Sequence, residues 1–234
     1  MNTSPEHPRD RILVVGRSPS VLLETVDILR GKGYAAHATN QFDQVLDDYD
    51  PAATDIVVFG GMVPAETKQY LRAEFSARNP KVSFVQGLAG IAGLVAAQAE
   101  GAASAGEAGD SDVAYDATQR VIRLTLNRTV HVIIEAWWAT SFTPPEPTST
   151  SMRVLDAELH EGYHVVPVPG EVPAEASFLT VAVGSAVYAF TVGAMPQSVM
   201  RMVPTGGRAA GTTPSPGAPA LPPVSVVNTR SHDS

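Results

Sequence analysis

Glycine residues recur where three short apolar runs end, at Gly16, Gly60–Gly61 and Gly87. Glycine lets a ligand approach the backbone closely, and the start of a following helix offers free N–H groups to an anion. We therefore consider a small anion or nucleotide site, although the phosphate-binding patterns G-x-G-x-x-G and G-x-x-x-x-G-K-[ST] are absent. The alternative is that these glycines only form strand-to-helix turns. The candidate ligand-binding residues are Gly16, Arg17, Ser18, Gly60, Gly61, Gln86 and Gly87.

Other side chains with catalytic or metal-binding chemistry lack partners along the sequence. His160 and His164 flank Glu161, but a metal site needs converging ligands and a further donor, and two exposed histidines at a turn are the simpler interpretation. Ser18 and Ser185 lie outside the nucleophile pattern G-x-S-x-G. We therefore expect no catalytic residue, no metal and no cofactor, and a protein that is not an enzyme.

Two adjacent tryptophans, Trp137 and Trp138, follow an apolar strand pattern. Neighbouring residues on a strand face opposite sides, so one indole can pack in a core while the other stays at the surface. An exposed tryptophan is a typical anchor for a protein partner and could also serve as a sugar platform. Packing alone is the alternative for both residues.

The composition excludes several classes of function. The chain has 234 residues and a formal net charge of −8, which disfavours binding to a nucleic-acid backbone. Cysteine is absent, so disulfides and thiolate chemistry are excluded. The polar N-terminus does not resemble a signal peptide, and no apolar segment is long enough to span a bilayer. We expect a cytoplasmic protein without nucleic-acid or membrane partners.

The elements that must position these residues alternate between strand and helix over 11–100. Apolar runs predict strands near 11–15, 34–39, 55–60 and 81–87, with helices between them and a last one over 88–100. Ser18-Pro19 is typical of a helix start. Such alternation predicts a parallel sheet with right-handed crossovers.

The pattern changes after residue 100. Residues 101–118 are rich in alanine, glycine and acids and are expected to form a linker. Over 119–200 the apolar period falls to two in six segments, which predicts a small antiparallel β-sandwich, with turns at Asn127-Arg128 and Gly184-Ser185. Residues 1–10 and the Pro/Gly/Ser-rich stretch 201–234 are expected to be disordered, although PSPGAPALPP could dock on a partner.

Two stretches of the first domain carry a family pattern, RILVVGRSPSVLLETVDILRGKGYAAHATNQFDQVLDDY and DIVVFGGMVP. On these stretches, residues 11–87 resemble a bacterial response-regulator receiver domain. In that family the third strand ends in the phospho-accepting aspartate, with Met-Pro shortly after. Here Met62 and Pro64 keep roughly those places, but Gly60 stands at the acceptor position. The resemblance implies a flavodoxin-like fold.

The remaining receiver positions also depart from the family pattern. Gly16 and Arg17 stand where an acidic pair would hold Mg²⁺, and Gln86 or Gly87 stands in place of a hydroxyl residue. No fifth strand with its lysine precedes the acidic linker. Without these groups, aspartyl-phosphate chemistry has neither a nucleophile nor charge compensation.

We therefore expect a degenerate, truncated receiver-like domain followed by a β-sandwich. The expected function is regulatory or scaffolding protein–protein interaction without catalysis. The alternative is a small-molecule or nucleotide sensor that uses the glycine-lined cleft. A sheet of four strands exposes an edge, so we expect VIRLTL to add a strand to it or a homodimer to cover it.

Overall fold

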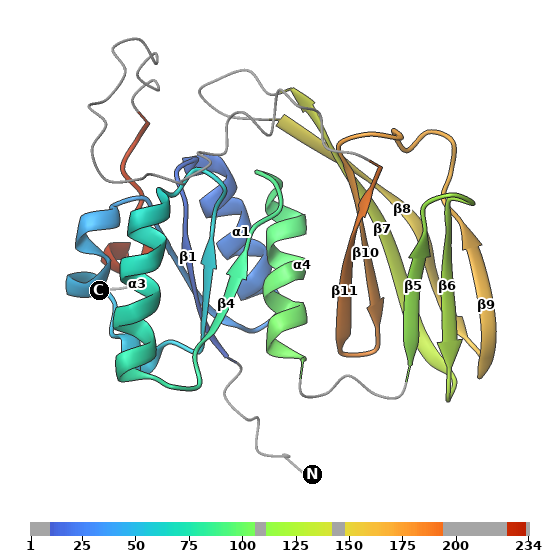
Figure 1. The fold of residues 1–234 in the computed structure, drawn as a ribbon, viewed down its shortest axis with the longest axis horizontal. Helices are drawn as coiled ribbons and strands as arrows, with labels where there is room; N and C mark the ends of the chain where they lie inside the picture. Colours follow the sequence, from blue (N-terminus) through green and yellow to red (C-terminus); the bar gives the residue numbers. More distant parts are fainter. Residues whose placement is uncertain (1–9, 106–110, 142–147, 194–223, 233–234) are drawn as a thin grey trace, which may run out of the picture.

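A computed structural model describes residues 10–105, 111–141, 148–193 and 224–232, and Figure 1 shows an α/β part followed by a β part. Within these residues no helix combines the length and the apolar character needed to cross a membrane.

The α/β part is built on four parallel strands in the order β2-β1-β3-β4, which confirms the predicted parallel sheet. Two short 3-10 helices, η1 and η2, flank α2. The elements are β1 (Arg11–Val15), α1 (Pro19–Gly31), β2 (Ala35–Thr39), η1 (Phe42–Gln44), α2 (Val45–Asp48), η2 (Pro51–Ala53), β3 (Ile56–Phe59), α3 (Ala65–Arg78), β4 (Ser83–Gln86) and α4 (Ala92–Ala103).

The sheet is covered on both faces, which is why β1 and β3 are continuous apolar runs. Alternate residues of a strand face opposite sides, so Ile12 and Val14 pack with α1 and α4, whereas Leu13 and Val15 lie in the core on the α3 side. The last helix, α4, therefore lies beside α1 and not beside α3 (Figure 1).

The β part contains two antiparallel sheets that enclose one core. The first has the order β11-β10-β7-β8 and the second β5-β6-β9. The strands are β5 (Asp112–Asp116), β6 (Val121–Leu126), β7 (Val130–Ser141), β8 (Thr148–Leu159), β9 (Gly162–Pro167), β10 (Ser177–Val183) and β11 (Ala186–Val192).

The β part departs from the prediction in its first strand, in the pairing of VIRLTL and in one of the two predicted turns. Strand β5 lies inside 101–118, so that stretch is not linker throughout. The VIRLTL segment forms β6 and pairs with β5 and β9, so the prediction that it extends the parallel sheet is wrong. Asn127-Arg128 joins strands of different sheets and is no hairpin turn, whereas Gly184-Ser185 does join the paired β10 and β11, with Gly184 at φ +60°.

Helix α4 is shared by the two parts of the chain. One side packs on α1 and the parallel sheet, and the other lies against β10 and β11. A Cβ at Gly93 would overlap the Trp137 ring, and one at Gly101 would lie 2.6 Å from the Val187 carbonyl oxygen. The small residues of α4 therefore allow close packing on both sides of the helix.

The chain returns to the α/β part at its C-terminal end. Asn228 forms an antiparallel bridge with Thr39, and Val227 is buried in the core shared by α1 and α4. A short 3-10 helix, η3 (Thr229–His232), follows. The expected disorder of 201–234 therefore does not hold for residues 224–232. The Val227 side chain is buried there, the Thr229 hydroxyl accepts from the Ala38 amide of β2, and the Val227 amide donates to the Asn40 side chain just after β2.

Candidate functional site

The glycines at the carboxyl ends of the strands lie side by side. The Gly60 amide donates to the Val15 carbonyl oxygen at 2.8 Å, and the Gly87 amide donates to the Phe59 oxygen at 2.8 Å. A Cβ on Gly60 would lie 3.3 Å from the Gly16 Cα, and one on Gly87 would lie 3.3 Å from the Phe59 oxygen. The sequence placed these three glycines at strand ends correctly. Close backbone packing gives Gly60 and Gly87 a structural reason, and a Cβ on Gly16 would lie 3.0 Å from the Leu22 side chain.

The Gln86 side chain crosses the end of the neighbouring strand. Its Nε2 donates to the Phe59 oxygen at 2.9 Å and to the Gly87 oxygen at 3.2 Å. The Gln98 amide of α4 donates to the Gln86 oxygen at 3.1 Å and accepts from the Leu88 amide at 3.0 Å. This end of β4 is thus held by neutral amides, which supply neither a nucleophile nor a metal ligand of the carboxylate type.

Arg17 and Ser18 form the turn from β1 into α1. Ser18 is the N-cap residue, and its carbonyl oxygen accepts from the Leu22 amide at 3.0 Å, but its hydroxyl makes no capping hydrogen bond. Both residues are half-buried, whereas Gly61 is exposed and has open space at its Cβ position. The predicted ligand-binding residues therefore come from the ends of β1, β3 and β4, and Gly16, Gly60 and Gly87 are the ones in mutual contact.

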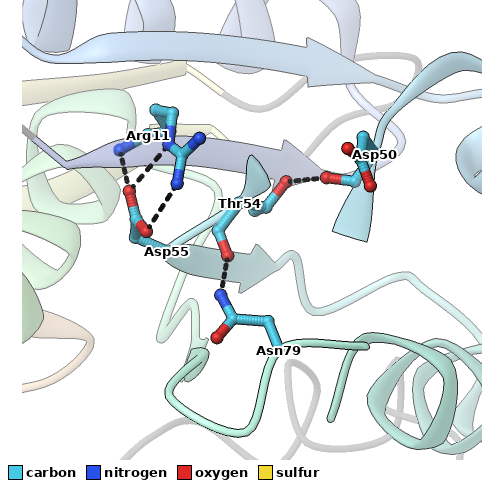
Figure 2. A network of polar contacts seen from close by, with 5 residues as sticks. All are labelled: Arg11, Asp50, Thr54, Asp55 and Asn79. Atoms are coloured by element: carbon cyan, nitrogen blue, oxygen red, sulfur yellow. Dashed lines mark hydrogen bonds and ion pairs between the residues drawn. The ribbon is translucent and has the colours of Figure 1, made fainter. Parts of the chain in front are cut away.

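A charged network lies at the opposite, amino-terminal edge of the same sheet (Figure 2). The Arg11 guanidinium donates to both carboxylate oxygens of Asp55 at 3.1 Å, and the Arg11 amide adds a bond of 2.9 Å. The hydrogen bonds from Arg11 lower the pKa of the Asp55 carboxyl group. Thr54 links this edge to Asp50 through its hydroxyl and to Asn79 through its carbonyl oxygen. These contacts tie β1 to β3 and to the end of α3, which is a structural role.

The two tryptophans proposed as partner-binding residues make contacts within the chain. Trp137 lies on Gly93 of α4 and donates from Nε1 to the Thr180 hydroxyl at 3.0 Å. Trp138 packs against the core of the β part. Both are half-buried, and packing accounts for the position of each.

His160 lies in the crossover from β8 to β9, and His164 lies within β9. His164 Nε2 is 2.8 Å from the His160 carbonyl oxygen, and His160 Nδ1 is 3.4 Å from the Thr129 hydroxyl. Across the described ranges, no three histidine or acidic side chains gather as metal ligands would. Ser185 is exposed in the turn between β10 and β11.

Two arrangements were missed at the level of sequence. The first is the contact of Asn228 with Asp48 and Tyr49: the Tyr49 hydroxyl donates to Asn228 Oδ1 at 2.7 Å, and Asn228 Nδ2 donates to Asp48 Oδ2 at 2.7 Å. The second is a pair of cations on α3, Lys68 and Arg72, of which Arg72 lies over the Phe84 ring of β4. The available signal for the Asn228 contact was the apolar pair Val226-Val227 within a Pro/Gly/Ser-rich stretch. The available signal for the cation pair was the i, i+4 spacing of Lys68 and Arg72.

Comparison with known proteins identifies no family. No family model matches the chain, and no curated protein matches it. Among solved structures, a β-glucosidase from Listeria innocua in complex with isofagomine aligns at a TM-score of 0.27 and 10% identity, and its complex with glucose aligns at 0.29 and 10%. Each alignment covers 83% of this chain and 47% of the other, so the chain spans about half the length of that enzyme. Likeness of this degree carries no argument about fold or activity.

Proposed function

We propose that the chain is a non-catalytic, cytoplasmic regulatory or scaffolding protein that works by binding other proteins through a phosphorylation-incompetent receiver-like domain and its attached β part. The observation that carries the proposal is Gly60 at the end of β3, the position at which a receiver has its phospho-accepting aspartate. The Cβ of any residue there would press on the Gly16 Cα at 3.3 Å. A nucleophilic side chain is therefore absent and poorly accommodated.

The order of the strands supports the receiver-like interpretation. The order β2-β1-β3-β4 is that of the first four strands of a flavodoxin-like sheet, 2-1-3-4-5. With right-handed crossovers, a helix leading from the fourth strand to a fifth would lie on the α3 face. Because α4 lies on the α1 face, we infer that it replaces the closing helix of such a domain and that a βα unit before it is missing.

The contact between α4 and the β part supports a role without a phosphorylation switch. The buried residues Ile91, Leu94 and Phe178 join the two parts in one small apolar cluster, with Trp137 packed against it. Moving α4 relative to the parallel sheet would disturb both sides of the helix. We infer that the surface presented to a partner is held in one state.

Treatment with acetyl phosphate and Mg²⁺ tests the proposal. Intact mass spectrometry is expected to detect no phosphoryl adduct, while a competent receiver treated in parallel acquires one. A stable acyl phosphate on this chain would overturn the proposal. Analytical ultracentrifugation over a range of concentrations tests whether the protein partner includes a second copy, as a homodimer.

A second candidate function is the sensing of a small anion or nucleotide at the glycines that follow the carboxyl ends of β1, β3 and β4. The specific observation is the Ser18 hydroxyl, which starts α1 without capping it, beside Gly16 and Arg17. A thermal-shift screen with nucleotides tests this function. A shift that Arg17→Gln removes and Arg128→Gln leaves intact would favour it over the first, and no shift across the panel would exclude it.

A further inference from the structure

The outer edge of β4 has no strand partner among the described residues. The Ser83 amide donates to the Asp55 oxygen and the Gly87 amide to the Phe59 oxygen, each at 2.8–2.9 Å, so the odd-numbered residues of this segment bond to β3. The backbone groups of Phe84 and Gln86 consequently point away from the sheet. This leaves a short row of donors and acceptors at an open edge.

One end of that open edge is already closed by a side chain. The Gln98 amide bonds the Gln86 oxygen and the Leu88 amide, much as the backbone of an added strand would. The Phe84 N–H, the Phe84 oxygen and the Gln86 N–H remain without a partner in the described structure. The free groups are therefore in the middle of β4.

Two cations lie one helical turn apart on α3, and one of them contacts this part of β4. The Arg72 guanidinium lies 5.3 Å from the centroid of the Phe84 ring and 5.6 Å from that of Phe59, and Lys68 precedes it by one helical turn. The ion pair described on α3 joins Arg78 to Glu74, and none joins Lys68 or Arg72 to a carboxylate in the described ranges. Burial, and then the charge of Arg72, lower the pKa of Lys68. Two like charges so placed repel each other, and an anion between them would relieve that repulsion.

We propose that the open edge of β4 binds an extended acidic segment of a partner protein as an added strand, with a carboxylate of that segment placed between Lys68 and Arg72. The inference rests on the proposed interaction function and names the class of partner. Charge complementarity supports it: residues 64–90 carry four basic and two acidic side chains, in a chain whose net charge is −8. Backbone pairing to a sheet edge is a common way to bind extended peptides.

The two faces of the sheet define the pattern of the segment. Phe84 packs in the core on the α3 face of the sheet, and Val85 packs in the core on the α4 face. Side chains of the bound segment that lie beside Phe84 would therefore face α3 and its cations, whereas those beside Val85 would face the α4 side. Leu88, 43% exposed, adds apolar surface at the end of the strand. The preferred ligand therefore alternates acidic and apolar residues.

Fluorescence anisotropy on the full-length chain tests the proposal with a labelled peptide of sequence EVEVEVE as the probe. The expected result is saturable binding that weakens about tenfold in the Lys68→Gln/Arg72→Gln variant, in keeping with the loss of close charge pairs at an interface. Lys68→Gln alone is expected to weaken the binding of the peptide. Arg128→Gln, which removes one positive charge from the exposed turn after β6, is its matched control. It is expected to leave the affinity unchanged.

A second probe separates strand addition from simple charge attraction. The same peptide N-methylated at alternate amides keeps its carboxylates but cannot pair with the edge, so it is expected to bind at least tenfold more weakly. In ¹⁵N spectra the amides of Phe84 and Gln86 are expected to shift with the first peptide only. Absence of binding, equal affinity for both peptides, or equal effects of Lys68→Gln and Arg128→Gln would each overturn the proposal. None of these results bears on the acetyl phosphate test, so failure here is distinguishable from failure of the proposed function.

Discussion

The indole ring of Trp137 lies directly on the Cα of Gly93, so that no side chain larger than hydrogen fits between β7 and α4 at this point. The two residues are far apart in the sequence and belong to different parts of the chain. Their contact extends the apolar cluster of Ile91, Leu94 and Phe178 that joins the α/β part to the β part. A substitution at this contact therefore tests how the α/β part and the β part are joined.

Replacing Gly93 by alanine is expected to destabilise the protein by about 1–3 kcal/mol, because the added methyl group overpacks the contact with the ring. The same change in a helix normally stabilises by roughly 0.5–1 kcal/mol. Gly31→Ala, at the end of α1 with open space around its Cβ, is the matched control and should be neutral or stabilising. Urea denaturation measures both. Equal effects of the two substitutions would contradict the packing argument, and Trp137→Phe should return part of the loss in the Gly93→Ala background.

Thr180→Val is expected to cost about 1–2 kcal/mol, because the Trp137 indole N–H loses its acceptor in a half-buried position. Thr180→Ser keeps the hydroxyl and should lose less than Thr180→Val. Thermal denaturation of the two variants provides the comparison. If the serine variant is as unstable as the valine variant, the methyl group and not the hydrogen bond is what matters at this site.

Asn228→Asp is expected to release the C-terminal segment from β2. The substitution puts a carboxylate oxygen where Asn228 Nδ2 now donates to Asp48 Oδ2 at 2.7 Å, so attraction becomes repulsion. Hydrogen exchange measures the release at two amides: Asn40 donates to the Val227 oxygen, and Ala38 donates to the Thr229 hydroxyl. Protection of both should fall about tenfold or more, which corresponds to roughly 1.4 kcal/mol.

Val226→Ala is the control for this experiment, because Val226 is 71% exposed. It should leave the protection of the Ala38 and Asn40 amides close to the wild-type level. Unchanged protection in Asn228→Asp would mean that the Asn228 contacts contribute little to the docking of the segment.

Asp55→Asn is expected to destabilise the protein by about 1 kcal/mol at neutral pH, since the pair with Arg11 is bidentate but partly exposed. The pKa of Asp55 is lowered in the folded state, so the unfolded state takes up the proton first. The contribution of Asp55 is therefore complete above its ordinary pKa of 3.8 and disappears as the pH falls through the lowered value. Chemical denaturation of wild type and variant between pH 7 and pH 2 measures the difference in their free energies of unfolding. This difference should narrow only at the acid end of the range. The exposed Asp47→Asn, for which no ion pair is described, is the control.

Local patterns were sufficient for much of the fold. Residues 12–15 and their counterpart Ile56–Phe59 are buried on both faces, as continuous apolar runs predict. The period of two after residue 118 corresponds to antiparallel strands. The glycines at 16, 60 and 87 stand at strand ends, as the apolar runs before them predict. These features depend on neighbours within a few residues, which is why they can be read along the chain.

The sequence by itself determined the types and order of most elements, the absence of cysteine chemistry and the absence of a side chain at Gly60. Only the tertiary structure decided which face α4 covers, that Trp137 lies on Gly93, that Asn228 reaches Asp48, and that Arg72 lies over Phe84 of β4. The physical reason is that each of these contacts joins segments whose own local patterns are satisfied in several arrangements. The choice among them depends on how whole surfaces fit together, which no local pattern records.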